Sequence, residues 1–219
     1  MRDVVRDAFV PFTAPLEGVV HWLYQDVKGL VSIGIGDLVD PIQLAMVLPF
    51  VHLDGTPATQ AEIASEWIRI KAYPDAARLG YRSVEHIAKL RLTDAGVASL
   101  VARKLMQMDA YLAHRFDGYV DWPADAQLGT LSMAWACGPA FRFPKLEAAL
   151  RSLDFRTAAI ECFMPEEATI SGLRPRNRAN KVLYLNAALS HELTLDPDHL
   201  YYPIDLATDP PDGDTHPGA

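Results

Sequence analysis

Two acidic side chains and a hydroxyl near the start of the chain have types and spacing suited to hydrolysis. Glu17 is followed nine residues later by Asp26, and Ser32 lies six residues further on. Cleavage of a glycosidic bond needs one carboxyl group that holds a proton for the leaving oxygen and one that is ionised and acts on water or sugar. A serine hydroxyl both donates and accepts hydrogen bonds, so Ser32 can hold the attacking water. From the residues alone, an ordinary solvated pair of acids near a turn stays the alternative.

A helix and a hairpin are needed to bring these residues together. Hydrophobic residues at helical spacing predict a short helix over residues 13–24, which would carry Glu17. A turn signal at 27–29 and hydrophobic residues alternating with small ones over 31–36 indicate a β-hairpin or small meander for Asp26 and Ser32. A helix-borne acid packed against apolar residues is favoured in its protonated form by desolvation, whereas an acid on a polar turn is not.

The rest of the chain has mostly helical patterns. Further helices are predicted at residues 40–48, 59–72, 83–90, 93–114, 124–136, 143–153, 156–163 and 177–192. The apolar, small-residue segment 124–136 is expected to be central and buried. Many helices and one small group of strands predict an α+β fold. We divide the chain into an N-terminal extension (1–12), a small α+β lobe with the acid pair (13–92), a helical lobe (93–192) and an acidic C-terminal tail (193–219), with a cleft between the lobes.

Composition narrows the class of protein. Half of the 219 residues are hydrophobic and 22% are charged, which is typical of a globular protein with a core. The net charge of −8 gathers at the end, where Glu192 and the residues after it include seven acids and no Lys or Arg, so we expect a solvated tail. No basic stripe points to nucleic acid, and no apolar run is long enough to span a membrane. Cys137 and Cys162 lie in apolar stretches and are expected to be buried free thiols.

A longer stretch around the acid pair resembles a known family. The segment PLEGVVHWLYQDVKGLVSIGIGDL is similar to the start of phage-type lysozymes, glycoside hydrolase family 24. That family has a Glu in its first helix, an Asp nine residues later and a Thr six residues further on, in a T-x-G-x-G-H strand; these positions fall on Glu17, Asp26 and Ser32. LTDAGVASLVARKL resembles the family's interlobe helix, LSMAWACGPAF its central buried helix, and residues 175–179 its P-N-R-A stretch. The resemblance covers residues 13–190, with insertions at 40–92 and 165–173.

The resemblance implies a lysozyme-like fold and an inverting muramidase that hydrolyses the β-1,4 MurNAc–GlcNAc bond of peptidoglycan. Glu17 would be the general acid, and Asp26 would position or deprotonate the water with help from Ser32. Such a pair leaves room for a water between its carboxyl groups, which lie about 6.5–9.5 Å apart in inverting enzymes. No metal and no organic cofactor is implied.

Other positions match the family's cleft or depart from its pattern. Leu38 and Trp135 match cleft-lining residues, although core packing is an equal alternative for Trp135, and Arg178 matches an arginine near the catalytic Glu. Ser32 replaces Thr and keeps the hydroxyl. Asp37 stands where the family has a structural His, which threatens a stabilising pair and adds a third acid near the first two.

The resemblance leaves the setting and one alternative function open. The N-terminus lacks the apolar core of a signal peptide, so a muramidase acting in the bacterial periplasm or cell wall would be released by a holin as a phage endolysin, or injected by a secretion system as an antibacterial toxin domain. The insertions favour the toxin, for which an immunity or inhibitor protein would be a partner besides the glycan strands; neither nucleic acid nor membrane insertion is expected. The alternative is an inactive lysozyme-like module that binds glycan or a partner protein.

Overall fold

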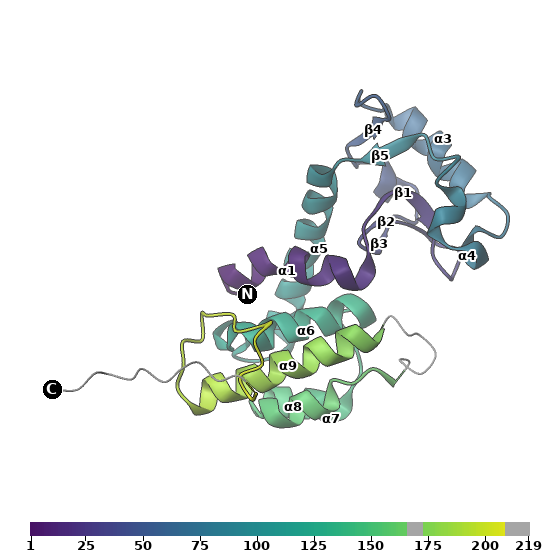
Figure 1. Cartoon of the computed structure of the whole chain (residues 1–219). Helices are drawn as coiled ribbons and strands as arrows, with labels where there is room; N and C mark the ends of the chain where they lie inside the picture. Colours follow the sequence, from purple (N-terminus) through teal and green to yellow (C-terminus); the bar gives the residue numbers. More distant parts are fainter. Residues whose placement is uncertain (166–172, 209–219) are drawn as a thin grey trace. The chain divides into compact units, whose positions relative to one another are not determined.

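Two units make up the chain, and a computed structural model describes residues 1–165 and 173–208 of it. Unit 1 consists of Met1–Leu16 with Leu105–Ala219, and unit 2 is Glu17–Lys104. Both boundaries fall within helices, namely α1 (Asp3–Glu17) and α5 (Asp94–Arg115). Helices and small antiparallel sheets are both present, so the protein is α+β as predicted (Figure 1).

Unit 2 holds two small antiparallel sheets. The strands β1 (Val20–Gln25), β2 (Val31–Gly34) and β3 (Asp37–Leu38) form a meander in chain order, which confirms the predicted hairpin or meander. A second sheet, β4 (Phe50–His52) with β5 (Leu90–Leu92), was not predicted from the sequence. Between these strands lie the helices α2 (Gln43–Met46), α3 (Gln60–Lys71) and α4 (Ala76–Leu79), followed by a 3₁₀ turn at Tyr81–Val84. The helix predicted at 83–90 is therefore wrong.

The helix predicted over residues 13–24 is wrong at both ends. It begins at Asp3 and ends at Glu17, and residues 20–25 form β1 instead. Gly18 adopts φ 76°, a left-handed conformation that ends helices readily. Beyond it the burial alternates in strand fashion: Leu23 is buried and Tyr24 is half-buried. Val20 and Leu23, whose spacing also suits a helix face, are thus buried residues of a strand.

Residues 1–12, expected to be an extension, form most of α1 and belong to the core of unit 1. Val5 and Phe9 are fully buried. The N-terminal ammonium group lies 2.8 Å from a carboxylate oxygen of Asp109, and the Arg2 side chain donates to the carbonyl of Trp122 at 2.8 Å. These contacts join the first turn of the chain to elements more than one hundred positions away.

Unit 1 is otherwise built from helices that pack side by side. It contains α6 (Ala124–Cys137), α7 (Pro144–Arg151), α8 (Phe155–Glu161) and α9 (Leu173–Glu192). The helix α9 packs against α6 and α8, and α8 against α7 (Figure 1). Nearly all of α6 is buried, as predicted, and Thr130 Oγ1 lies 3.0 Å from the Tyr184 hydroxyl of α9. Within the described ranges, no helix combines the length and the apolar character that crossing a bilayer requires.

The segment after α9 corrects the expectation of a solvated tail. The fully buried carboxylate of Asp125 in α6 accepts hydrogen bonds from the backbone N–H groups of Tyr201 and Tyr202, at 2.9 and 3.0 Å. Leu206 is buried, and its backbone N–H donates to Asn186 at 2.9 Å. Residues 201–206 are thus anchored to α6 and α9, whereas Asp196 and Asp198 earlier in the segment are exposed. The rest of the expected tail, 209–219, lies outside the described residues.

Both cysteines are free, as expected, but only Cys162 is buried. Burial raises the pKa of the Cys162 thiol to about 12, so it stays protonated near neutral pH. Cys137 is exposed at the end of α6, which corrects the expectation that both thiols are buried.

Candidate functional site

The acid pair and the hydroxyl singled out in the sequence all belong to unit 2. Glu17 is the last residue of α1, Asp26 follows β1, and Ser32 lies in β2 with 4% of its surface exposed. Asp26 is half-buried and Glu17 is exposed. The expectation of a helix-borne acid packed among apolar residues is therefore wrong for Glu17, because the helix ends there and the chain turns away at Gly18.

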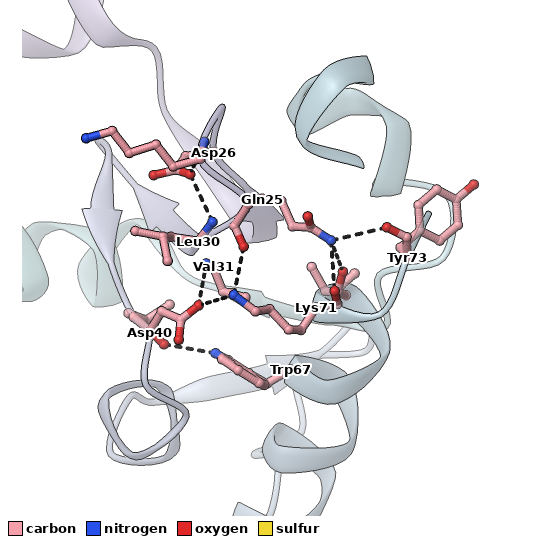
Figure 2. A network of polar contacts seen from close by, with 12 residues as sticks. Gln25, Asp26, Leu30, Val31, Asp40, Trp67, Lys71 and Tyr73 are labelled. Carbon is pink, nitrogen blue, oxygen red and sulfur yellow. Dashed lines mark hydrogen bonds and ion pairs between the residues drawn. The ribbon is translucent and has the colours of Figure 1, made fainter. Parts of the chain in front are cut away.

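Asp26 closes the turn between β1 and β2. Its Oδ1 accepts the backbone N–H groups of Lys28 and Leu30 at 2.8 and 2.9 Å, and its own N–H donates to the Leu30 carbonyl at 2.8 Å (Figure 2). These bonds hold the carboxylate in one orientation. The turn alone would explain why an aspartate stands at this position. Because Oδ1 is engaged in the turn, any chemistry by Asp26 depends on its second oxygen, Oδ2.

The end of α3 anchors the first strand of this hairpin. The amide nitrogen of Gln25, the last residue of β1, donates to the carbonyls of Ile70, Lys71 and Tyr73 at 2.8, 3.1 and 3.2 Å (Figure 2). Gln25 is buried, so these carbonyls at and just after the end of α3 gain a donor inside the protein. The strand that precedes Asp26 is therefore tied to the end of α3.

Lys71 holds the other side of the same hairpin. Its Nζ donates to the Gly29 carbonyl at 2.7 Å and to Asp40 Oδ2 at 2.6 Å, and Asp40 Oδ2 also accepts the Val31 N–H at 3.2 Å (Figure 2). The hydrogen bond from Lys71 is the main reason that the pKa of Asp40 lies below its usual value. One lysine thus joins the turn, β2 and the segment after β3.

Cross-strand register aligns a row of side chains next to the acids. Ser32 pairs with Tyr24 in β1 and with Leu38 in β3, and directly opposed residues project from the same face of a sheet. Leu38, expected to line a cleft, is 48% exposed. Sequence analysis missed Tyr24, although its position two residues before Asp26 on an alternating strand was a usable signal.

Tyr24 is half-buried, and the charges of three carboxylates act on it. Its pKa is raised to about 12, first by burial and then by the negative charges of Asp37, Glu17 and Asp26. Both members of the acid pair therefore act on the same phenol, which stays protonated and can donate a hydrogen bond near neutral pH. The end of α1, the hairpin turn and the start of β3 supply the three carboxylates.

Asp37 has an ionic partner in α5. It is 2% exposed, its Oδ2 accepts the Ile35 N–H at 3.2 Å, and its Oδ1 lies 3.5 Å from Lys104 Nζ of α5. Burial raises the pKa of Asp37, while Lys104 opposes that shift. A Cβ at Gly34, which has φ 68°, would lie 2.9 Å from Asp37 Oδ2. The expectation that Asp37 threatens a stabilising pair stays a prediction.

Trp135 and Arg178 belong to unit 1. Trp135 is 7% exposed, and its ring centroid lies 5.0 Å from that of Phe9, which fits core packing and leaves little surface for a sugar. Arg178 lies in α9 and is exposed, whereas its neighbour Arg176 is buried and donates to Ser132 Oγ at 2.9 Å. Contact of Trp135 or Arg178 with the acid pair stays a prediction.

Comparison with known proteins adds no family assignment: no family model matches the chain, and no curated protein matches it. Among residues 1–165 and 173–208, no three His, Cys, Asp or Glu side chains gather as a metal site would require.

Proposed function

We propose that the chain is a glycoside hydrolase that cleaves the MurNAc–GlcNAc bond of peptidoglycan with inversion. The observation that carries this proposal is that Glu17 ends α1 just before β1, Asp26 follows β1 directly, and Ser32 pairs with Tyr24 of that strand. Two carboxyl groups and a hydroxyl are the groups that water-mediated glycoside cleavage needs.

In the proposed reaction Glu17 gives its proton to the glycosidic oxygen as the bond from that oxygen to the anomeric carbon breaks. A water on the opposite face of the sugar forms the new bond to the anomeric carbon, and its proton passes to Asp26. Asp26 Oδ1 is already engaged in the turn, so Oδ2 is the atom assigned to this water. The Ser32 hydroxyl accepts from or donates to the same water.

This proposal places the substrate in the bacterial periplasm or cell wall. The chain would arrive as an antibacterial toxin domain through a secretion system, or as an endolysin through a holin. In the first setting an immunity protein would be its partner.

The test is release of new reducing ends from purified peptidoglycan, with loss of turbidity as a second readout. We expect Glu17→Gln and Asp26→Asn to lower the rate at least about a hundredfold, the lower end for a general acid or base. Asparagine keeps Oδ1, so the turn should survive. Glu85→Gln, an exposed acid elsewhere in unit 2, is the matched control. Equal clearing by wild type and Glu17→Gln would reject the assignment, and binding without reducing ends would favour the glycan-binding module.

A further inference from the structure

Three aromatic side chains form a continuous strip that begins at the candidate site. Tyr24 and Trp22 come from β1, and Tyr81 comes from the 3₁₀ turn after α4. The centroid of the Tyr81 ring lies 6.1 Å from that of Tyr24 and 6.2 Å from that of Trp22. The Trp22 indole N–H donates to the Tyr81 backbone carbonyl at 3.0 Å. We call Trp22, Tyr24 and Tyr81 the aromatic strip.

The strip lies on the outer face of β1. Leu23 and Gln25 are buried on the side that meets α3, whereas Trp22 and Tyr24 are half-buried. Residues two apart on a strand share a face, and common contact with Tyr81 confirms this for Trp22 and Tyr24. Because Tyr24 opposes Ser32, the strip extends the candidate site along β1, away from the turn that Asp26 closes.

Two arginines flank the strip. The guanidinium of Arg91 lies 4.9 Å from the Trp22 ring centroid and is held by the carbonyls of Ala88 and Leu90 at 3.1 and 3.0 Å. The guanidinium of Arg82 lies 5.6 Å from the Tyr81 ring centroid. Tyr81 is 39% exposed and Arg82 is exposed. The strip therefore combines accessible ring surface with fixed positive charge.

We propose that the aromatic strip binds a sugar of the glycan strand beyond the cleaved bond, with Arg82 and Arg91 facing the carboxylates that muramic acid carries on its lactyl group or peptide. This inference rests on the proposed function, since Tyr24 belongs to both the strip and the site. A pyranose presents a face of C–H groups, which packs on an aromatic ring while the sugar hydroxyls stay in water. Rigid aromatic rings provide such contact area with little loss of side-chain entropy.

Tyr81 is the residue to test, because it lies in the inserted segment and outside the catalytic machinery. Rates on purified peptidoglycan at several substrate concentrations should show that Tyr81→Ala raises the apparent KM about fivefold to tenfold with little change in kcat. Tyr81→Phe keeps the ring but loses the hydroxyl that accepts from Arg82 Nε at 3.2 Å, so it should raise the KM less than Tyr81→Ala does. Tyr111→Ala, at a tyrosine of α5 that is 45% exposed, is the matched control. An unchanged KM in Tyr81→Ala would overturn the proposal.

Binding separates failure of the strip from failure of the hydrolase. Sedimentation with insoluble peptidoglycan should show weaker retention of Tyr81→Ala in a Glu17→Gln background, whether or not wild type cleaves. Arg82→Gln should weaken retention on peptidoglycan but not binding of uncharged chitohexaose. Loss of thermal stability and binding in both Tyr81→Ala and Tyr81→Phe would indicate a merely structural cluster and reject the proposal. Absence of reducing ends with wild type would reject the hydrolase alone.

Discussion

Replacement of Lys71 by methionine should loosen the hairpin that carries Asp26. The variant keeps most of the side-chain stem and removes the ammonium group that donates to the Gly29 carbonyl and to Asp40. Hydrogen bonds to charged groups contribute about 1.5–3 kcal/mol each. The side chains of Lys71 and Asp40 are 35% and 17% exposed, so solvent screening reduces that sum. We expect Lys71→Met to lower the free energy of unfolding by about 2 kcal/mol near neutral pH.

The effect should depend on pH in one direction. In the folded protein Lys71 lowers the pKa of Asp40, so the unfolded chain binds more protons as the pH falls below the ordinary aspartate value of about 3.9. The stability that this pair contributes is present above that value and is lost as the pH drops through the folded pKa. The difference between wild type and Lys71→Met should therefore shrink at about pH 2.5, where the bond to the Gly29 carbonyl is what remains.

Urea unfolding followed by tryptophan fluorescence at both pH values measures this difference. Lys28→Met, at an exposed lysine of the same hairpin, is the control for removing a charge. A double-mutant cycle with Asp40→Asn should give a coupling of about 1 kcal/mol near neutral pH and none in acid. A Lys71→Met variant as stable as wild type near neutral pH, or a difference that grows on acidification, would refute the reasoning.

Two further substitutions test contacts that the sequence did not reveal. In thermal unfolding, Gly34→Ala should lower the free energy of unfolding by about 3 kcal/mol and Gly36→Ala by about 1 kcal/mol. Both glycines adopt positive φ, but only a Cβ at Gly34 would meet Asp37 Oδ2. Equal losses of stability in the two variants would contradict the close contact with Asp37. Asp125→Ala should lower the free energy of unfolding by about 3 kcal/mol and speed amide hydrogen exchange at Tyr201 and Tyr202, whose amides lose their acceptor. Unchanged exchange at these two amides would show that other contacts hold the segment.

Features that depend on neighbouring residues could be predicted well. A helix was predicted from residue 59, and Thr59 and Glu62 form a capping box at the start of α3. The Thr59 N–H donates to Glu62 at 2.8 Å, and the Glu62 N–H donates to the Thr59 hydroxyl at 3.3 Å. The burial of α6 and the alternating strands of the meander were also predicted from the sequence. In each case the signal and the bonds it predicts lie within a few residues of each other.

Errors arose where apolar spacing was compatible with two structures. Residues 16–23 suit a helix face, but they were shared between the end of α1 and β1, and the pairing with β2 decided the outcome. The sheet of β4 and β5 was missed because its strands are short and even its nearest paired residues, His52 and Leu90, are 38 positions apart in the sequence. Short strands carry little periodic signal, and their stability comes from the partner strand.

The sequence alone predicted the α+β class, because the helical and strand patterns are local. It also singled out Glu17, Asp26 and Ser32, because they lie within sixteen consecutive residues around one short hairpin. Three-dimensional packing was needed to show that Tyr24 lies under the charges of both acids, that Lys104 pairs with Asp37, and that Asp125 binds the segment after α9. These contacts join positions far apart in the chain, and a charged or polar side chain does not indicate in its own neighbourhood which distant partner will satisfy it once both are buried.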